Sequence, residues 1–308
     1  MENKMENKME EISSQRKLEA LEENGTLIRK DGKTFLQLDC ENAKELSMKW
    51  GEKLYPFTKT GKKWILELPF STPVNYVQIC VDGQEVLSPE LPIAHGYGRP
   101  YNYIELPDED GLFELRDVPH GTLTREFYKS KISDNWEKLI VYLPPCVPSA
   151  GLPVLYLQHG FGESEISWST TGKVNLLMDN LIAAGKIKPF AIVMGNGMVK
   201  QRIDGELKLN RALYGQMLVE EILPMLEKKY QFGGSKEKRG MAGLSMGSVQ
   251  TTRIICEHPE LFSEVGIFSG FLRDRIVGDE EHDGIVPKSG GQSYLKAMDD
   301  ASFNTYFH

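Results

Sequence analysis

Two patterns of hydrophobic and polar positions divide this chain, and the first covers residues 24–107. Here apolar and polar residues alternate with a period of two in short segments, which glycine and proline residues separate. Such alternation with frequent turn residues is typical of antiparallel strands that bury one face. The pattern predicts a small all-β sandwich over residues 24–107, preceded by a polar N-terminal tail over residues 1–23. The clearest predicted strands are residues 33–38, 63–68 and 74–81, the last followed by Asp82 and Gly83.

The second pattern starts at about residue 137, where short apolar runs alternate with helical ones. The predicted strands are residues 138–143, 154–158, 190–194, 239–244 and 265–268, and residues 303–308 begin another. The predicted helices are residues 173–184, 210–230, 248–257 and 292–299. Apolar strands separated by helices predict an α/β domain over residues 108–308, built on a mostly parallel, doubly wound sheet. The carboxyl ends of its strands meet at one edge, where functional sites form.

A Gly-x-Ser-x-Gly pentapeptide, Gly243-Leu-Ser-Met-Gly247, lies at the end of one predicted strand and before a predicted helix. In this context the serine is expected to act as a nucleophile, with its hydroxyl at the carboxyl end of the strand. The two glycines are required because side chains there would collide with the neighbouring strand and helix. The following helix points its positive end at the place where an oxyanion would form. We therefore predict Ser245 as the nucleophile and the amide of Met246 as an oxyanion donor.

A second glycine-rich segment, His159-Gly-Phe-Gly162, directly follows another predicted strand. An oxyanion hole needs two backbone N–H groups that converge on one point, and the amide of Phe161 is the predicted second donor. A plain glycine-rich connection is the alternative interpretation. We expect His159 to brace this loop, because the catalytic base of an α/β-hydrolase follows the serine in the chain.

Four further residues are predicted to line a pocket at the same edge of the sheet: Gly160, Gly162, Trp168 and Asn196. The two glycines flank Phe161 and let the backbone approach a substrate. Trp168 is placed to cover an acyl group, with ordinary packing as its alternative role. Asn196 follows the strand over residues 190–194, and a turn without another role is its alternative.

The acid and the histidine that a catalytic serine needs should follow it on loops after later strands. Three histidines follow Ser245: His258 at a predicted helix end, His282 between Asp279 and Asp283, and His308 at the last position. We expect His258 to cap its helix and the charged run around His282 to be a solvated loop. A local dyad of His282 with Asp279 or Asp283 is the alternative. The sequence stops within a predicted strand, so the simpler expectation is a chain cut short that lacks the catalytic acid and histidine.

Composition and charge limit the classes of binding partner and the cellular location that we expect. The chain has 308 residues and a net charge of -8 without a basic cluster, so nucleic acid is not an expected partner. No apolar run approaches the ~20 residues of a membrane helix, and the N-terminus lacks the apolar core of a secretory signal. The spacing of Cys40, Cys80, Cys146 and Cys256 suggests neither disulfides nor a metal site. We expect free thiols and a cytoplasmic location, with secretion as the alternative if the N-terminus was processed.

Several segments resemble the putative esterase family of α/β-hydrolases, with the similarity covering about residues 137–270. This family includes the feruloyl and acetyl-xylan esterases of carbohydrate esterase family one, the enterochelin esterases and the S-formylglutathione hydrolases. The strand, Asp-Gly turn and strand of residues 76–89 resemble the immunoglobulin-like, carbohydrate-binding-module-like domain that often precedes feruloyl-type members. The segments similar to the family are Val141-Tyr-Leu-Pro-Pro145, residues 152–160, residues 179–189, residues 239–247 and Phe268-Ser-Gly270.

The resemblance implies a serine carboxylesterase that hydrolyses acyl or feruloyl esters of plant polysaccharide through an acyl-enzyme, without a metal or organic cofactor. Its expected partner is a small ester or an acylated carbohydrate. It maps Ser245 to the nucleophile and Phe161 and Met246 to the oxyanion donors. Trp50 and Trp64 are candidates for a sugar platform, although core packing is favoured for each. A non-catalytic glycan-binding protein with an inert hydrolase scaffold is the alternative from another class.

Overall fold

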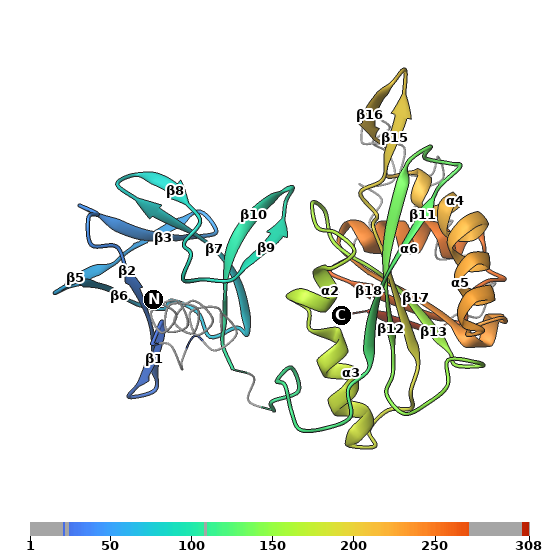
Figure 1. Ribbon diagram of the computed structural model, residues 1–308, viewed down its shortest axis with the longest axis horizontal. Helices are drawn as coiled ribbons and strands as arrows, with labels where there is room; N and C mark the ends of the chain where they lie inside the picture. Colours follow the sequence, from blue (N-terminus) through green and yellow to red (C-terminus); the bar gives the residue numbers. More distant parts are fainter. Residues whose placement is uncertain (1–20, 22–24, 108–109, 271–303, 308) are drawn as a thin grey trace, which may run out of the picture. The chain divides into compact units, whose positions relative to one another are not determined.

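The computed structural model describes Leu21, residues 25–107, residues 110–270 and residues 304–307. The chain divides into two compact units (Figure 1). Of the described residues, the first unit takes those up to 94 together with residues 99–107, and the second takes residues 95–98, 110–270 and 304–307. Both glycine-rich segments lie in the second unit.

The first unit is built from two antiparallel sheets that share one hydrophobic core. One sheet has the strand order β1-β2-β6-β5, and the other has the order β4-β3-β7-β10-β9, with β8 paired to β7. The predicted strands over residues 33–38, 63–68 and 74–81 are present as β2, β6 and β7. The strands are β1 (Leu27–Lys30), β2 (Lys33–Asp39), β3 (Leu46–Trp50), β4 (Lys53–Pro56), β5 (Thr58–Thr60), β6 (Lys63–Glu67), β7 (Val74–Val81), β8 (Gln84–Val86), β9 (Ile93–Gly96) and β10 (Arg99–Glu105).

Both tryptophans of this unit pack inward. Trp64 is 5% exposed, and its indole Nε1 donates to the carbonyl of Cys40 at 2.9 Å. Trp50 packs against the same core, with its ring 5.0 Å from that of Phe70. The favoured core role is therefore correct for Trp64, and Trp50, which is partly buried, packs against the edge of the same core.

The second unit contains a seven-stranded sheet in the order β11-β12-β14-β13-β17-β18-β19. The two pairs that involve β12 are antiparallel, and every pair from β14 to β19 is parallel. The prediction of a mostly parallel sheet is thus correct, although it missed β11, an antiparallel edge strand. The strands are β11 (Thr122–Lys129), β12 (Trp136–Leu143), β13 (Val154–Gln158), β14 (Ala191–Gly195), β17 (Arg239–Leu244), β18 (Glu264–Phe268) and β19 (Asn304–Phe307).

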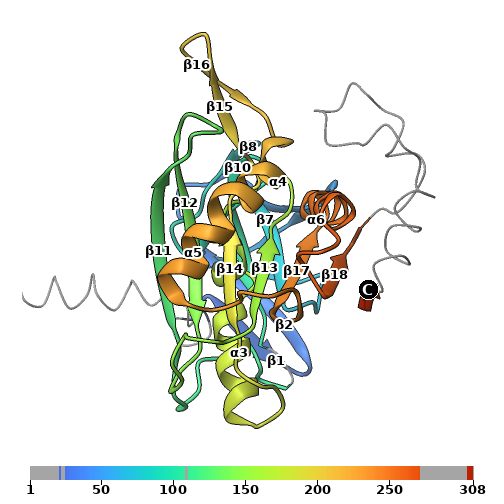
Figure 2. The same cartoon turned by 90° about the vertical axis from the view of Figure 1, so that its right-hand side faces the viewer.

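Helices cover both faces of this sheet, as the alternation of strands and helices requires (Figures 1 and 2). On one face Val174 and Met178 of α3 pack against the sheet. On the other face the segments α4, η1, α5 and α6 enclose the larger core. None of the described helices is long and apolar enough to cross a membrane. The helices are α2 (Ser167–Thr170), α3 (Val174–Ala183), α4 (Leu213–Met217), the π-helical turn η1 (Leu218–Ile222), α5 (Leu223–Tyr230), the 3₁₀ turn η2 (Lys236–Lys238) and α6 (Met246–Glu257).

The single helix predicted over residues 210–230 is interrupted, and this prediction needs correction. The helical segment starts at Leu213 and passes through the wider turn η1 before α5 begins. Pro224, at the start of α5, has no N–H to donate to the carbonyl four residues earlier, and its ring crowds that carbonyl. Widening the preceding turn accommodates this defect without breaking the helix.

A two-stranded hairpin, β15 (Lys200–Ile203) and β16 (Glu206–Leu209), projects from the second unit between β14 and α4 (Figure 1). Ile203 pairs with Glu206, so Asp204 and Gly205 form a two-residue loop. Both loop residues have positive φ, 52° and 83°, which defines the type I′ turn favoured in tight hairpins. The sequence analysis predicted no hairpin in this segment, although Asp-Gly between runs of alternating apolar and polar residues is a signal for one.

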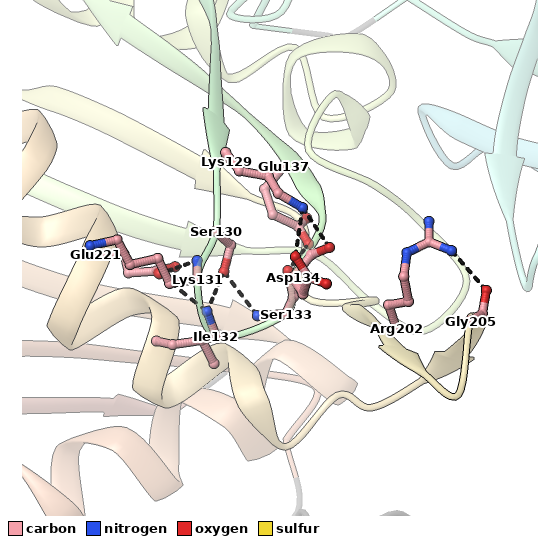
Figure 3. Close-up of polar contacts among 10 residues, drawn as sticks. All are labelled: Lys129, Ser130, Lys131, Ile132, Ser133, Asp134, Glu137, Arg202, Gly205 and Glu221. Atoms are coloured by element: carbon pink, nitrogen blue, oxygen red, sulfur yellow. Dashed lines mark hydrogen bonds and ion pairs between the residues drawn. The ribbon is translucent and has the colours of Figure 1, made fainter.

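The loop between β11 and β12 is anchored to η1 by a carboxylate (Figure 3). Oε1 of Glu221 accepts the N–H groups of Lys131 at 2.7 Å and Ile132 at 3.3 Å. Oγ of Ser130 accepts the N–H of Ser133 at 3.0 Å. These bonds satisfy backbone donors that would otherwise be buried without partners.

A second carboxylate, Glu137, lies buried in the same region, 7% exposed. It accepts the hydroxyl proton of Ser133 at 2.8 Å (Figure 3). Burial raises the pKa of Glu137 above its ordinary value, and the nearby carboxylates of Glu221 and Glu165 add to this effect. A carboxyl group with a raised pKa in the folded state binds protons more tightly there than in the unfolded chain. Its ionisation therefore lowers stability as pH rises from the unfolded pKa through the folded one.

We predict that Glu137→Gln stabilises the second unit at pH 8 and has a smaller effect at pH 4. The amide oxygen can still accept from Ser133, and no buried charge has to form. The expected gain at pH 8 is on the order of 1 kcal/mol, or about 2–4 °C in Tm. Thermal unfolding of both proteins at the two pH values measures it. A loss of stability at pH 8 would contradict the prediction.

Candidate active site

Ser245 occupies a single-residue turn between β17 and α6. Its backbone adopts φ 51° and ψ −111°, a conformation that residues other than glycine rarely hold. Its N–H donates to the carbonyl of Phe268 at 2.9 Å, which fixes the turn against β18. The side chain is partly exposed. The turn therefore places Ser245, partly exposed, at the carboxyl edge of the sheet.

The two glycines of the pentapeptide are close to other atoms in the way that the sequence predicts. A Cβ on Gly243 would lie 2.2 Å from the carbonyl oxygen of Gly247, at the start of the helix. A Cβ on Gly247 would lie 2.7 Å from the carbonyl oxygen of His159, beyond the neighbouring strand. Both contacts are shorter than packed atoms allow, so neither position can carry a larger residue without moving the turn.

Met246 is the first residue of α6. The first N–H groups of a helix have no carbonyl partner within it, and they lie at the positive end of the helix dipole. The amide of Met246, the residue after Ser245, therefore makes no hydrogen bond within the helix.

The second glycine-rich loop begins next to this turn. Gln158, the last residue of β13, pairs with Gly243 of β17. The loop closes as a tight turn, in which the N–H of Glu163 donates to the carbonyl of Gly160 at 3.3 Å. Gly162 holds φ 75° at the third position, which favours glycine in a type II turn. Phe161 occupies the second position, and its N–H has no hydrogen bond to another described residue.

His159 braces this loop, as expected from the sequence. It is 1% exposed, its Nδ1 lies 2.7 Å from the carbonyl oxygen of Gly160, and its Nε2 accepts the N–H of Gly197 at 3.0 Å. A carbonyl only accepts, so Nδ1 carries the proton and Nε2 is unprotonated. Burial lowers the pKa of His159, which keeps this neutral tautomer. With both nitrogens engaged, the ring holds two loops together and is not placed to accept a proton from Ser245.

The remaining predicted pocket residues lie at the same edge of the sheet. Nε1 of Trp168 donates to the carbonyl of Gln158 at 2.9 Å, and its ring lies 6.2 Å from that of Phe268. Asn196 follows β14, and its side-chain oxygen accepts the N–H of Met198 at 2.9 Å. Trp168 and Phe268 thus form an aromatic pair next to the Ser245 turn, whereas the side chain of Asn196 stabilises its own loop.

No histidine or carboxylate among the described residues is hydrogen-bonded to the hydroxyl of Ser245. His258 follows the last residue of α6, where its N–H donates to the carbonyl of Ile254, so the expected capping position is correct. His282, Asp279, Asp283 and His308 lie outside the described residues. Within the described part of the chain there is also no group of three histidine, cysteine or acidic side chains suited to a metal ion.

A histidine–aspartate pair that sequence reasoning missed lies at the opposite edge of the sheet. Nδ1 of His120 is 2.9 Å from Oδ2 of Asp179, and its Nε2 bonds the carbonyl of Arg116. Asp179 is 2% exposed and also accepts the hydroxyl of Tyr142 at 2.6 Å. Tyr142 pairs with Ile192 near the start of β14, remote from the carboxyl ends of the parallel strands. The pair therefore fastens the segment before β11 to α3 and does not serve the serine.

The comparisons with known proteins identify the family of this chain. Residues 130–304 match the family model described as putative esterase. Over 213 residues the chain is 35% identical to an endo-1,4-beta-xylanase/feruloyl esterase of Xylanibacter ruminicola. That match covers 66% of this chain but only 29% of the relative.

Solved structures support the fold. The enterobactin esterase of Shigella flexneri in the presence of enterobactin superposes with a TM-score of 0.61 at 12% identity, covering 91% of this chain and 88% of that one. A mutant feruloyl esterase module of Clostridium thermocellum complexed with sinapinate superposes with a TM-score of 0.50 at 18% identity, covering 70% and 72%. The second unit thus has the α/β-hydrolase fold of these esterases. The chain belongs to the putative esterase family of carboxylic ester hydrolases, which confirms the resemblance seen in the sequence.

We predict that Gly243→Ala destabilises the second unit by several kcal/mol, at the upper end of the range for single substitutions. The added methyl group would meet backbone atoms, which cannot rotate away. Gly215→Ala in α4 is the matched control, because its methyl group would meet only the flexible end of Ile254 at 3.2 Å. Denaturant unfolding measures both. Equal stabilities of the two variants would contradict the close packing of the turn.

We predict that His120 contributes to stability in acid and less in alkali. The hydrogen bond that His120 donates to the carboxylate of Asp179 raises the pKa of His120 above its ordinary value of ~6.5. The contribution is therefore fully present below pH ~6.5 and is lost as pH rises through the folded pKa. His120→Ala should lower the Tm more at pH 5.5 than at pH 9. A difference in Tm that stays constant across this range would show that the imidazole charge plays no part.

Proposed function

We propose that this chain is a serine carboxylesterase that hydrolyses acyl or feruloyl esters of plant polysaccharide. The observation that carries the proposal is the left-handed turn of Ser245, with the amide of Met246 beside it and the loop of Phe161 beginning at the adjacent strand. The substrate class is supported by the similarity to the xylanase/feruloyl esterase of Xylanibacter ruminicola.

In the proposed reaction Oγ of Ser245 attacks the ester carbonyl carbon, and its proton passes to a general base. The tetrahedral oxyanion accepts hydrogen bonds from the amides of Phe161 and Met246. The carbon–oxygen bond to the alcohol then breaks, the alcohol leaves with the proton returned by the base, and an acyl-enzyme remains. Water attacks the acyl carbon in the same way, which releases the acid and restores the serine hydroxyl.

The proposal also assigns the general base, the acyl pocket and the first unit. The general base lies outside the described residues, because no described histidine or carboxylate is bonded to Ser245. The aromatic pair of Trp168 and Phe268 forms one wall for the acyl group, and Gly160, Gly162 and Asn196 line the pocket. The first unit is proposed to be an immunoglobulin-like accessory domain, supported by its two antiparallel sheets around one core.

The proposal predicts that hydrolysis of p-nitrophenyl acetate and methyl ferulate depends on Ser245. Ser245→Ala should lower turnover by at least about 10³-fold, since the nucleophile is lost. Ser263→Ala is the matched control, because Ser263 precedes β18 at the other edge of the sheet. Labelling with a fluorophosphonate reports the nucleophile even where turnover is slow.

Turnover that persists in Ser245→Ala would contradict the proposal. Absence of both turnover and labelling in the unmodified protein would also contradict it, and would favour a glycan-binding protein with an inert hydrolase scaffold.

A further inference from the structure

The loop that carries the proposed second oxyanion donor is held mainly through its backbone, by hydrogen bonds at Gly160. Phe161 stands between two glycines, whose backbones restrict its peptide groups little. Phe161 is 44% exposed, so packing secures only part of this residue. Glu163 holds one side of the loop, since its carboxylate accepts the N–H of Gly160 at 2.8 Å. The carbonyl of Gly160 belongs to the same peptide group as the Phe161 amide, and it accepts from the N–H of Glu163 and from Nδ1 of His159. A contact with the Phe161 ring adds a constraint through the side chain.

Arg211 supplies a contact of this kind. The carbon of its guanidinium lies 4.9 Å from the centre of the Phe161 ring, in a cation–π arrangement. The Nε atom of this guanidinium is buried, so the group is partly removed from water, and this burial lowers the pKa of Arg211. It remains charged at neutral pH. Cation–π contacts strengthen as the cation loses water, so this contact is stronger than one on an open surface.

The backbone of Arg211 is itself fixed. It comes directly after the β15–β16 hairpin, whose base is closed by the N–H of Asn210 donating to the carbonyl of Val199 at 2.8 Å. The carbonyl of Arg211 accepts a hydrogen bond from Nε2 of Gln250 at 3.2 Å. The guanidinium therefore projects from an anchored segment.

Gln250 connects this segment to the nucleophile turn. It is 3% exposed and lies in α6, one helical turn after Met246. Its Nε2 also donates to the carbonyl of Gly197 at 3.0 Å, so it holds both ends of the segment between β14 and α4. Helix α6 thus provides one proposed oxyanion amide, that of Met246. Through Gln250 it also holds Arg211, whose guanidinium contacts the ring of Phe161, the other proposed donor residue.

We propose that Arg211 is a positioning residue, which aims the Phe161 amide at the oxyanion through its contact with the Phe161 ring. This inference rests on the proposed function of the site. Arg211 does not donate to the reacting atoms in this scheme; it restricts the loop that does. Its loss should weaken binding of the transition state and leave binding of the ground state nearly unchanged.

The test compares Arg211→Ala, Arg211→Lys and Arg202→Ala in the full chain. Arg202 lies on the hairpin and bonds only within it through its guanidinium, to the carbonyl of Gly205 at 2.8 Å, so it serves as the control. For Arg211→Ala we expect kcat to fall about tenfold with KM within about twofold. This is less than the 10²–10³ for a deleted oxyanion donor, because the N–H remains. Arg211→Lys keeps the charge and should recover part of kcat, whereas Arg202→Ala should match the unmodified enzyme.

A second measurement does not depend on turnover. Hydrogen exchange of the peptide that spans residues 159–163 should be faster in Arg211→Ala than in the unmodified protein and unchanged in Arg202→Ala. Absence of both turnover and fluorophosphonate labelling in the unmodified protein would refute the proposed function, while the exchange rates would still decide the role of Arg211. An unchanged kcat in Arg211→Ala, or unchanged exchange in a protein without turnover, overturns the inference.

Discussion

The one-residue turn at Ser245 is the constraint on which the rest of the site depends. A non-glycine residue in such a conformation costs on the order of 1–3 kcal/mol, and it persists only where its surroundings enforce it. The strand before the turn and the helix after it both enforce this conformation. Strand β17 is paired on both sides, with β13 and β18, and α6 buries Ile254 and Ile255 in the larger core. The strain at the serine is therefore offset by packing that has no part in the chemistry.

The tightness of this turn determines what surrounds it. Because Gly247 has no side chain, the first turn of α6 approaches the end of β13. That approach removes Gln158, His159 and Gln250 from solvent, with each at most 3% exposed. Buried polar groups are costly unless they are hydrogen-bonded, and His159 and Gln250 find their partners on the adjoining loops, whereas Nε2 of Gln158 donates to Gln250. The hydrogen bonds from Gln250 to the carbonyls of Gly197 and Arg211 hold both ends of the segment from Asn196 to Arg211.

Elements whose signal lies within one segment could be predicted from the sequence. The pentapeptide around Ser245, the apolar runs of β13, β14 and β17 and the alternation of β7 each contain their own evidence, and the structure has these elements. Other local signals were present but were not used. Asp204-Gly205 indicates a tight hairpin, and Pro224 within a helical pattern indicates a disturbed helix. Strand β11 alternates in the same way as the strands of the first unit, yet it belongs to the second.

Contacts between distant segments could not be predicted in the same way. The pair of His120 and Asp179 joins residues 59 positions apart, and nothing near either residue indicates the other. Arg211 follows Phe161 by 50 positions and stands in a stretch whose charge resembles that of a solvated loop. The two proposed oxyanion donors therefore differ in how far the local sequence predicts their positions. Met246 follows from the local turn, because any residue after a serine in this conformation begins the helix. Phe161 depends on a glycine-rich loop whose shape is set by side chains from elsewhere in the unit. Substitutions that spare the pentapeptide can therefore still impair the site, and they should do so where they loosen contacts between segments that the sequence keeps far apart.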